Sequence, residues 1–74
     1  MNVEAILIGG PLDGKLYTFE KGKHTVFFGS NSVPIRYWKY CRTHEKTRYG
    51  FWRFKFKGEA TKAEVEQNYQ ERVP

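Results

Sequence analysis

Residues 35–57 constrain the fold more than any other stretch, because their side chains alternate as they would in two paired strands. Successive side chains of a strand point to opposite faces of a sheet. One face of such a hairpin is mostly apolar: Ile35, Tyr37, Lys39, Cys41, Gly50, Trp52, Phe54 and Phe56. The other combines rings with cations: Arg36, Trp38, Tyr40, Arg42, Tyr49, Phe51, Arg53, Lys55 and Lys57. We expect the first face to be buried and the second to be exposed.

The pairing follows from where the chain is expected to reverse, at residues 44–47. With Thr43 opposite Arg48, Tyr40 would pair with Phe51. A slip of two residues would leave the faces unchanged, because the side-chain period of a strand is two. This hairpin therefore predicts that Trp52 belongs to the core and that Trp38 belongs to the exposed face.

The rest of the chain alternates between short apolar runs and turn residues. The five predicted strands cover residues 3–8, 15–20, 24–28, 35–43 and 48–57. Thr61 and Glu64 then have the spacing of a capping box, which predicts a helix. We expect a mainly β (α+β) fold of about five short antiparallel strands, in a meander or small barrel-like sheet, followed by one C-terminal helix. Residues 1–74 would form a single small domain, with the sheet over 2–57 and the helix over about 61–72.

Charge is concentrated in the predicted hairpin. The whole chain of 74 residues has a net charge of +5, whereas residues 34–57 alone carry eight cations against Glu45. A localised basic patch favours an anionic partner. The single cysteine allows no intrachain disulfide, and no apolar run approaches the roughly 18 residues of a membrane span. We therefore expect a cytoplasmic protein with no membrane contact.

The segment Gly9–Gly14 (GGPLDG) has the glycine and lysine spacing of a phosphate-binding P-loop when Lys15 is included. Leu16, however, stands where the magnesium-binding Ser or Thr belongs, and the residues after it alternate as a strand. Without a following helix there is no helix N-terminus to hold phosphate. The proline and glycines are better explained as a turn between the first two strands, which we expect to form a hairpin.

This opening also carries a resemblance. A strand that leads into GGPLDG, followed by Lys15–Phe19 (KLYTF) and a later tyrosine-rich basic hairpin, resembles small uncharacterised proteins of bacteriophages and prophages. Residues 4–19 carry most of the resemblance, and residues 35–66 match only in general pattern. It implies a phage origin, a small β-rich fold and a bacterial cytoplasm as the site of action, and no particular chemistry.

Catalytic and metal sites are not expected. Cys41, His24 and His44 show no metal-ligand spacing, and Cys41 is expected to be a buried thiol on the apolar face. The acidic side chains of the tail are explained by the start of the helix and by solvation: Glu59, Glu64, Glu66 and Glu71. We find no acid/base pair with a pocket, and so predict no enzyme activity, cofactor, metal or small-molecule substrate.

The face of rings and cations carries the functional hypothesis. Rings stack on unpaired bases while Arg and Lys neutralise phosphates, so this face predicts binding of nucleic acid, with single-stranded DNA or RNA preferred. The alternative is a phage-encoded protein that binds and modulates a host protein through the same face, because Trp, Tyr and Arg also dominate protein interfaces. A third possibility is structural: the rings form a second core layer beneath the acidic helix. The sequence does not indicate an oligomeric state.

Overall fold

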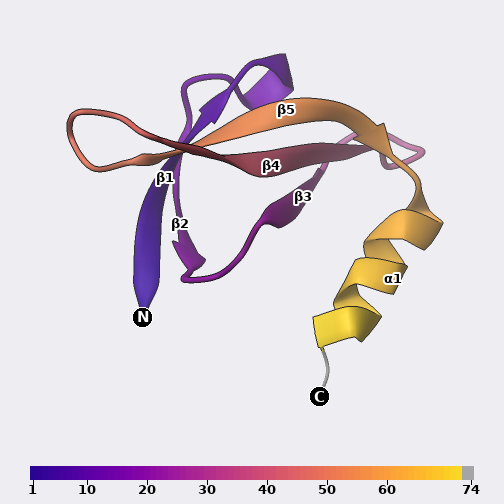
Figure 1. Ribbon diagram of the computed structural model, residues 1–74. Helices are drawn as coiled ribbons and strands as arrows, with labels where there is room; N and C mark the ends of the chain where they lie inside the picture. The colour runs from indigo at the N-terminus through magenta and orange to yellow at the C-terminus, as the bar shows by residue number, and fades with distance from the viewer. Residues whose placement is uncertain (73–74) are drawn as a thin grey trace.

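The computed structural model describes residues 1–72, with side chains described as far as residue 67. Five strands and one C-terminal helix make up the fold (Figure 1). The strands are β1 Asn2–Ile8, β2 Leu16–Glu20, β3 Thr25–Gly29, β4 Tyr37–Lys46 and β5 Trp52–Ala60. A short 3-10 helix, η1 Gly10–Leu12, joins β1 to β2, and α1 Lys62–Arg72 follows β5. The predicted mainly β class is therefore confirmed.

The strands form one open sheet in the order β2-β1-β5-β4-β3. The predicted β1–β2 hairpin is confirmed, with Ala5 opposite Tyr17. β5, the last strand in the sequence, lies in the centre and pairs parallel with β1, placing Ala5 beside Trp52. The connectivity is thus not a meander, and the sheet does not close into a barrel. Strands that are neighbours in sequence usually pair, so no local pattern indicated this long-range parallel contact.

The core lies on one face of this sheet, which we call the core face and which carries the buried side chains of Ala5, Leu7, Val26, Tyr40 and Phe54. The sheet twists strongly: in Figure 1, β1 and β2 stand at a steep angle to β4 and β5, although β1 pairs parallel with β5. This curvature brings the two edge strands together: the Tyr17 ring of β2 lies 4.9 Å from Phe28 of β3, centroid to centroid. Phe19 of β2 similarly lies 5.0 Å from Phe54 of β5. Rings from both edges therefore complete a core that a flat sheet would leave open.

The segment Gly9–Gly14 folds over this core and is held there by Tyr40. The Tyr40 hydroxyl donates to the Gly9 carbonyl (2.7 Å) and accepts from the Leu12 amide (3.0 Å). Gly10 has a φ of +65°, and a Cβ on it would lie 2.5 Å from Phe56 Cγ, so only glycine fits. The predicted turn is confirmed, and Gly10 allows the loop to pack closely on Phe56 of β5.

The pairing of β4 with β5 differs from the sequence prediction. The strand β4 continues to Lys46, and the chain reverses later, where the Thr47 amide donates to the Phe51 carbonyl (2.7 Å). Tyr40 consequently pairs with Phe56 rather than with Phe51. That shift is an odd number of residues, which exchanges the faces of one strand relative to the other. The predicted division of the hairpin into two faces is therefore wrong.

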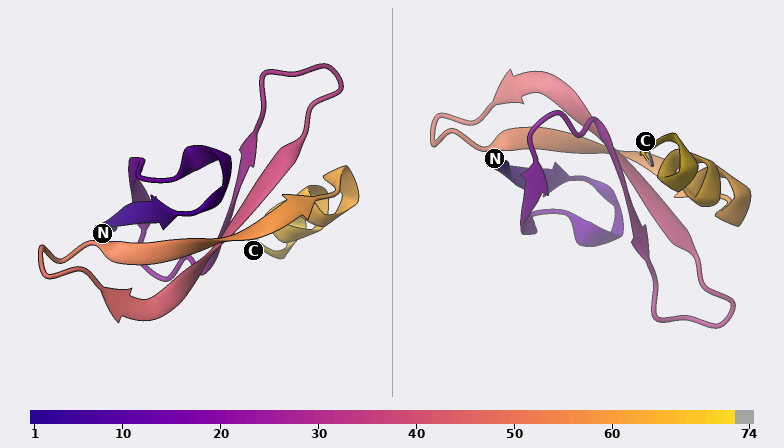
Figure 2. Two further views of the ribbon diagram at one scale, coloured as in Figure 1. Left: turned by 90° about the horizontal axis from the view of Figure 1, so that it is seen from above. Right: turned by 90° about the horizontal axis from the view of Figure 1, so that it is seen from below.

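The helix α1 leaves the end of β5 and extends away from the sheet (Figures 1 and 2). Its first turn is fixed by Thr61, whose hydroxyl accepts from the Glu64 amide (3.1 Å), as the predicted cap requires. Val65 is 9% exposed, and Glu64 lies 3.7 Å from the Lys39 ammonium. The side chain of Glu71, another acid of the predicted helix, lies outside the described residues. Lys39, the residue that Glu64 approaches, alternates with Trp38 along β4, so this contact places the start of α1 toward the face opposite Trp38.

Candidate nucleic-acid interface

The nine predicted binding residues do not share one surface. Tyr40 is fully buried in the core, and Trp38 is half-buried against it. Arg53 and Lys55 lie on the opposite face of the sheet, where they pair with Ile6 and Ile8 of β1. The remaining five are placed around the hairpin: Arg36 before β4, Arg42 on the core face, Tyr49 and Phe51 in the turn, and Lys57 at a β-bulge.

The predicted core set is divided in the same way. Phe54 is fully buried, and Trp52 and Phe56 pack against the core, as predicted. Tyr37, Lys39 and Cys41 instead alternate with the buried Tyr40 and so belong to the opposite face, where each is half-buried. Two further members, Ile35 (56% exposed) and Gly50, lie outside the strands.

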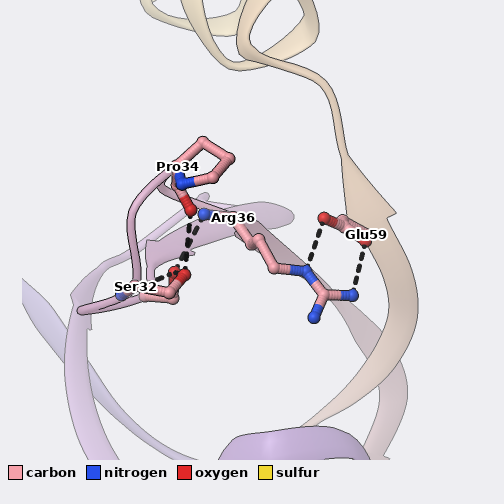
Figure 3. Close-up of polar contacts among 5 residues, drawn as sticks. Ser32, Pro34, Arg36 and Glu59 are labelled. Carbon is pink, nitrogen blue, oxygen red and sulfur yellow. Dashed lines mark hydrogen bonds and ion pairs between the residues drawn. The ribbon is translucent and has the colours of Figure 1, made fainter.

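At the α1 end of the hairpin, acidic side chains neutralise two of the cations, Arg36 and Lys39. Arg36 donates from Nε and one terminal nitrogen to the two carboxylate oxygens of Glu59, both at 3.0 Å (Figure 3). This hydrogen-bonded pairing lowers the pKa of Glu59 and raises that of Arg36. Lys39 is similarly close to Glu64 (3.7 Å). A cation already held by a carboxylate has less to gain from a phosphate, so this end is the weaker anion site.

The loop before β4 fixes the Arg36 backbone beside this ion pair. The Ser30 hydroxyl accepts from the Arg36 amide (2.8 Å), and the Ser32 hydroxyl donates to the Pro34 carbonyl (2.9 Å) (Figure 3). The loop and the start of α1 border an open hollow of about 660 Å³. Its lining is Pro34, Ile35, Arg36, Tyr37, Glu59, Ala60, Thr61 and Lys62. Because Glu59 engages the Arg36 guanidinium, this hollow offers few free polar groups for an anion.

At the other end of the hairpin, cations lie on aromatic rings. The Arg42 guanidinium carbon is 4.7 Å from the centre of the Trp52 ring, and the Lys46 ammonium is 4.8 Å from it. Arg48 lies 5.1 Å from the ring of Tyr49, which is 73% exposed. We call these five residues the hairpin end: Arg42, Lys46, Arg48, Tyr49 and Trp52. They lie at the opposite end of β4 and β5 from α1 (Figure 1).

Among the described side chains, those of residues 1–67, none of the three cations of the hairpin end forms an ion pair with a carboxylate. The nearby acid Glu45 instead accepts from Arg53 (3.1 Å). Cation–π contacts at exposed sites are worth about 0.5–1 kcal/mol, so they hold these side chains only lightly. The hairpin end therefore combines available positive charge with two aromatic rings.

The comparisons with known proteins do not extend this picture. No family model, curated protein or solved structure matches the chain.

Other kinds of site find no support in the described part of the chain. No group of His, Cys, Asp and Glu side chains there could hold a metal ion, and no helix there is long and apolar enough to cross a membrane. The P-loop alternative fails because the loop's own contacts occupy its amides: Gly9 N–H donates to Asp13 Oδ1 (2.6 Å), and Gly14 N–H to the Leu7 carbonyl (2.8 Å).

Sequence reasoning missed three members of the hairpin end: Lys46, Arg48 and Trp52. Lys46 is expected in the turn, Arg48 at the start of the fifth strand and Trp52 in the core, because the expected reversal lies too early in the chain. Gly50 was the available signal: its φ of +89° lies in the region that favours glycine, and such residues mark turns. Centring the reversal near Gly50 would have left Lys46 in β4, opposite Trp52.

Proposed function

We propose that this chain binds nucleic acid through the hairpin end, with single-stranded DNA or RNA preferred over duplex. The observation that carries the proposal is that three cations lie on aromatic rings instead of on carboxylates. Such an arrangement supplies the two components of single-strand recognition, which are rings for base stacking and positive charge for phosphates.

The position of the hairpin end supports the same proposal. It projects at the edge of the molecule, away from the acidic residues at the start of α1 (Figures 1 and 2). Lys55 and Lys57 are exposed farther along β5 and would add to the positive field without direct contact. A nucleic acid strand could thus approach the rings without meeting Glu59 or Glu64.

The test is a fluorescence anisotropy titration of a labelled single strand with the full chain, repeated over a range of salt concentrations. The double variant Lys46→Met/Arg48→Met removes two phosphate contacts, each of which contributes about 0.7 to the logarithmic salt slope of a single strand. We expect that slope to fall by about 1.4 and the affinity at about 50 mM salt to fall roughly fifty-fold.

Lys62→Met is the matched control, because Lys62 is an exposed cation at the α1 end. It should change the affinity by less than about twofold, since exposed charges beyond a Debye length are screened. Absence of binding at low salt, or equal losses in the control and the double variant, would refute the proposed function.

A protein partner bound by the hairpin end is the second candidate. It is favoured by the 73% exposure of Tyr49 beside Arg48, since Tyr and Arg are enriched among the dominant residues of protein interfaces. Such a partner would be a host protein if the chain is of phage origin. A chain that fails to bind oligonucleotides but is captured by a protein partner, with capture lost in Tyr49→Ala, would favour this candidate.

A further inference from the structure

The ring of Trp52 occupies a position that differs from that of every other ring in the hairpin. Trp52 is the first residue of β5 and is flanked on both sides, by Lys46 of β4 and by Ala5 of β1. It is half-buried and packs against the core, while Arg42 and Lys46 both lie within 5 Å of its ring centre. The strands therefore fix the ring, and two cationic side chains lie over it.

Neither cation is tied to this place by a strong contact. The only side-chain polar contact of Arg42 within residues 1–67 is a long one of 3.5 Å to His24 Nε2, and Lys46 has none. A cation–π contact at an exposed site is worth only about two- to five-fold in an equilibrium constant. Stacking of one base on a protein ring is worth roughly five- to 150-fold, so a base can replace either cation.

Trp38 offers a comparison within the same molecule. Arg36 lies 4.9 Å from the Trp38 ring centre, a spacing like those at Trp52. Arg36, however, is held by two hydrogen bonds to Glu59, and the Trp38 ring packs edge-on against Phe56 (6.3 Å). The same kind of cation–ring contact is thus fixed at Trp38 and releasable at Trp52.

We infer that Trp52 is the ring on which an unpaired base stacks, and that Arg42 and Lys46 move from the ring to the phosphates beside that base. This inference rests on the proposed function. It adds the residue that receives the base, and the movement of the two cations that exposes the ring of that residue. The ligand it specifies is an unpaired nucleobase with a phosphate on each side. The bases of an intact duplex cannot reach the ring, so a duplex would meet only the cations.

Two single-tryptophan proteins separate this inference from the proposed function. Trp38→Phe leaves Trp52 as the only tryptophan, and Trp52→Phe leaves Trp38. Each is titrated with an oligothymidine of about ten nucleotides, within the range of known single-strand site sizes, and with a duplex of equal phosphate content. Binding is read from the anisotropy of the labelled nucleic acid and stacking from tryptophan fluorescence. Circular dichroism confirms that each variant is folded.

We expect oligothymidine to quench Trp52 fluorescence strongly and Trp38 fluorescence little, and the duplex to bind without quenching Trp52. Trp52→Phe should weaken single-strand binding by at least about fivefold, because a smaller ring stacks less well. It should leave the salt slope unchanged, since both cations remain. Trp38→Phe should keep its affinity.

Three results would overturn the inference. Single strands that bind without quenching Trp52 would refute stacking on this ring and leave the proposed function intact. Equal quenching by the duplex would refute the requirement for an unpaired base. Absence of anisotropy change at low salt, with both proteins folded, would refute the proposed function and the inference together.

If Trp38→Phe does not fold, iodide quenching of the wild-type chain with and without oligothymidine supplies the same answer, because a stacked Trp52 is shielded from iodide.

Discussion

Replacing Tyr40 by phenylalanine tests the most specific contact in the core. The change removes one oxygen and keeps the ring, which packs 5.2 Å from Phe56 and 5.8 Å from Phe28. The burial of apolar area is therefore nearly constant. What is lost is the pair of hydrogen bonds to the Gly9 carbonyl and from the Leu12 amide.

The size of the effect follows from those two backbone groups. A buried donor or acceptor left without a partner costs about 1–3 kcal/mol. Both groups belong to a loop whose other residues are largely exposed, such as Pro11 and Asp13, so some relaxation toward water is possible. We therefore expect a loss of about 2–3 kcal/mol. A chain of this size has a total stability of roughly 4–11 kcal/mol, so this is a large fraction.

Thermal unfolding followed by circular dichroism measures this loss. At about 4–8 °C per kcal/mol for a domain of this size, Tyr40→Phe should lower the Tm by roughly 10–20 °C. Tyr49→Phe is the matched control, since it deletes the same oxygen from an exposed side chain whose one hydrogen bond comes from Arg48 (3.1 Å). It should lower the Tm by no more than about 4 °C. Equal shifts in the two variants would show that the buried hydroxyl does not anchor the loop.

Two further changes test the loop and the ion pair. Gly10→Ala should lower the free energy of unfolding in urea by at least about 3 kcal/mol, because the left-handed backbone costs about 1–2 kcal/mol and the new Cβ meets the Phe56 ring. Gly14→Ala, with open space around it, should lose only the backbone part. Equal losses in the two variants would refute the close packing at Gly10. Glu59→Gln should lower the Tm at neutral pH, and the difference from the wild-type chain should shrink as the solution is acidified. Arg36 lowers the folded-state pKa of Glu59, so the stabilisation is present above the carboxyl's unfolded pKa and is lost as the pH falls through the folded value. A Tm difference that does not shrink in acid would contradict this.

Local chemistry predicted much of the fold. The turn at Gly9–Gly14, the β1–β2 hairpin and the capped helix after Thr61 all follow from residues close together in sequence, and the structure confirms them. The central position of β5 did not follow, because its parallel contact with β1 joins distant segments. The alternation of side chains predicts the two faces of a strand but does not indicate which strand lies beside it.

The candidate site was predicted in composition and not in arrangement. The same stretch carries both rings and cations, but the late reversal around Gly50 changed which of them share a face. Tyr40 looked suitable for an exposed platform because nothing local distinguishes it from Tyr49. Its burial depends on a loop some 30 residues away that offers a carbonyl and an amide to its hydroxyl. The alternation of side chains in a sequence does not indicate such long-range polar contacts.

The place of β5 between β1 and β4 has a consequence for how the chain is made. During synthesis the β1–β2 and β3–β4 hairpins emerge first, each with an unpaired edge that only β5 can fill. Folding must therefore wait until residues 52–60 have left the ribosome, and the non-local pairing of Ala5 with Trp52 then makes a slow closing step. A nascent chain stalled before Trp52 would hold two open strand edges, the kind that associate with other chains. Premature termination should thus yield aggregates rather than a smaller folded protein.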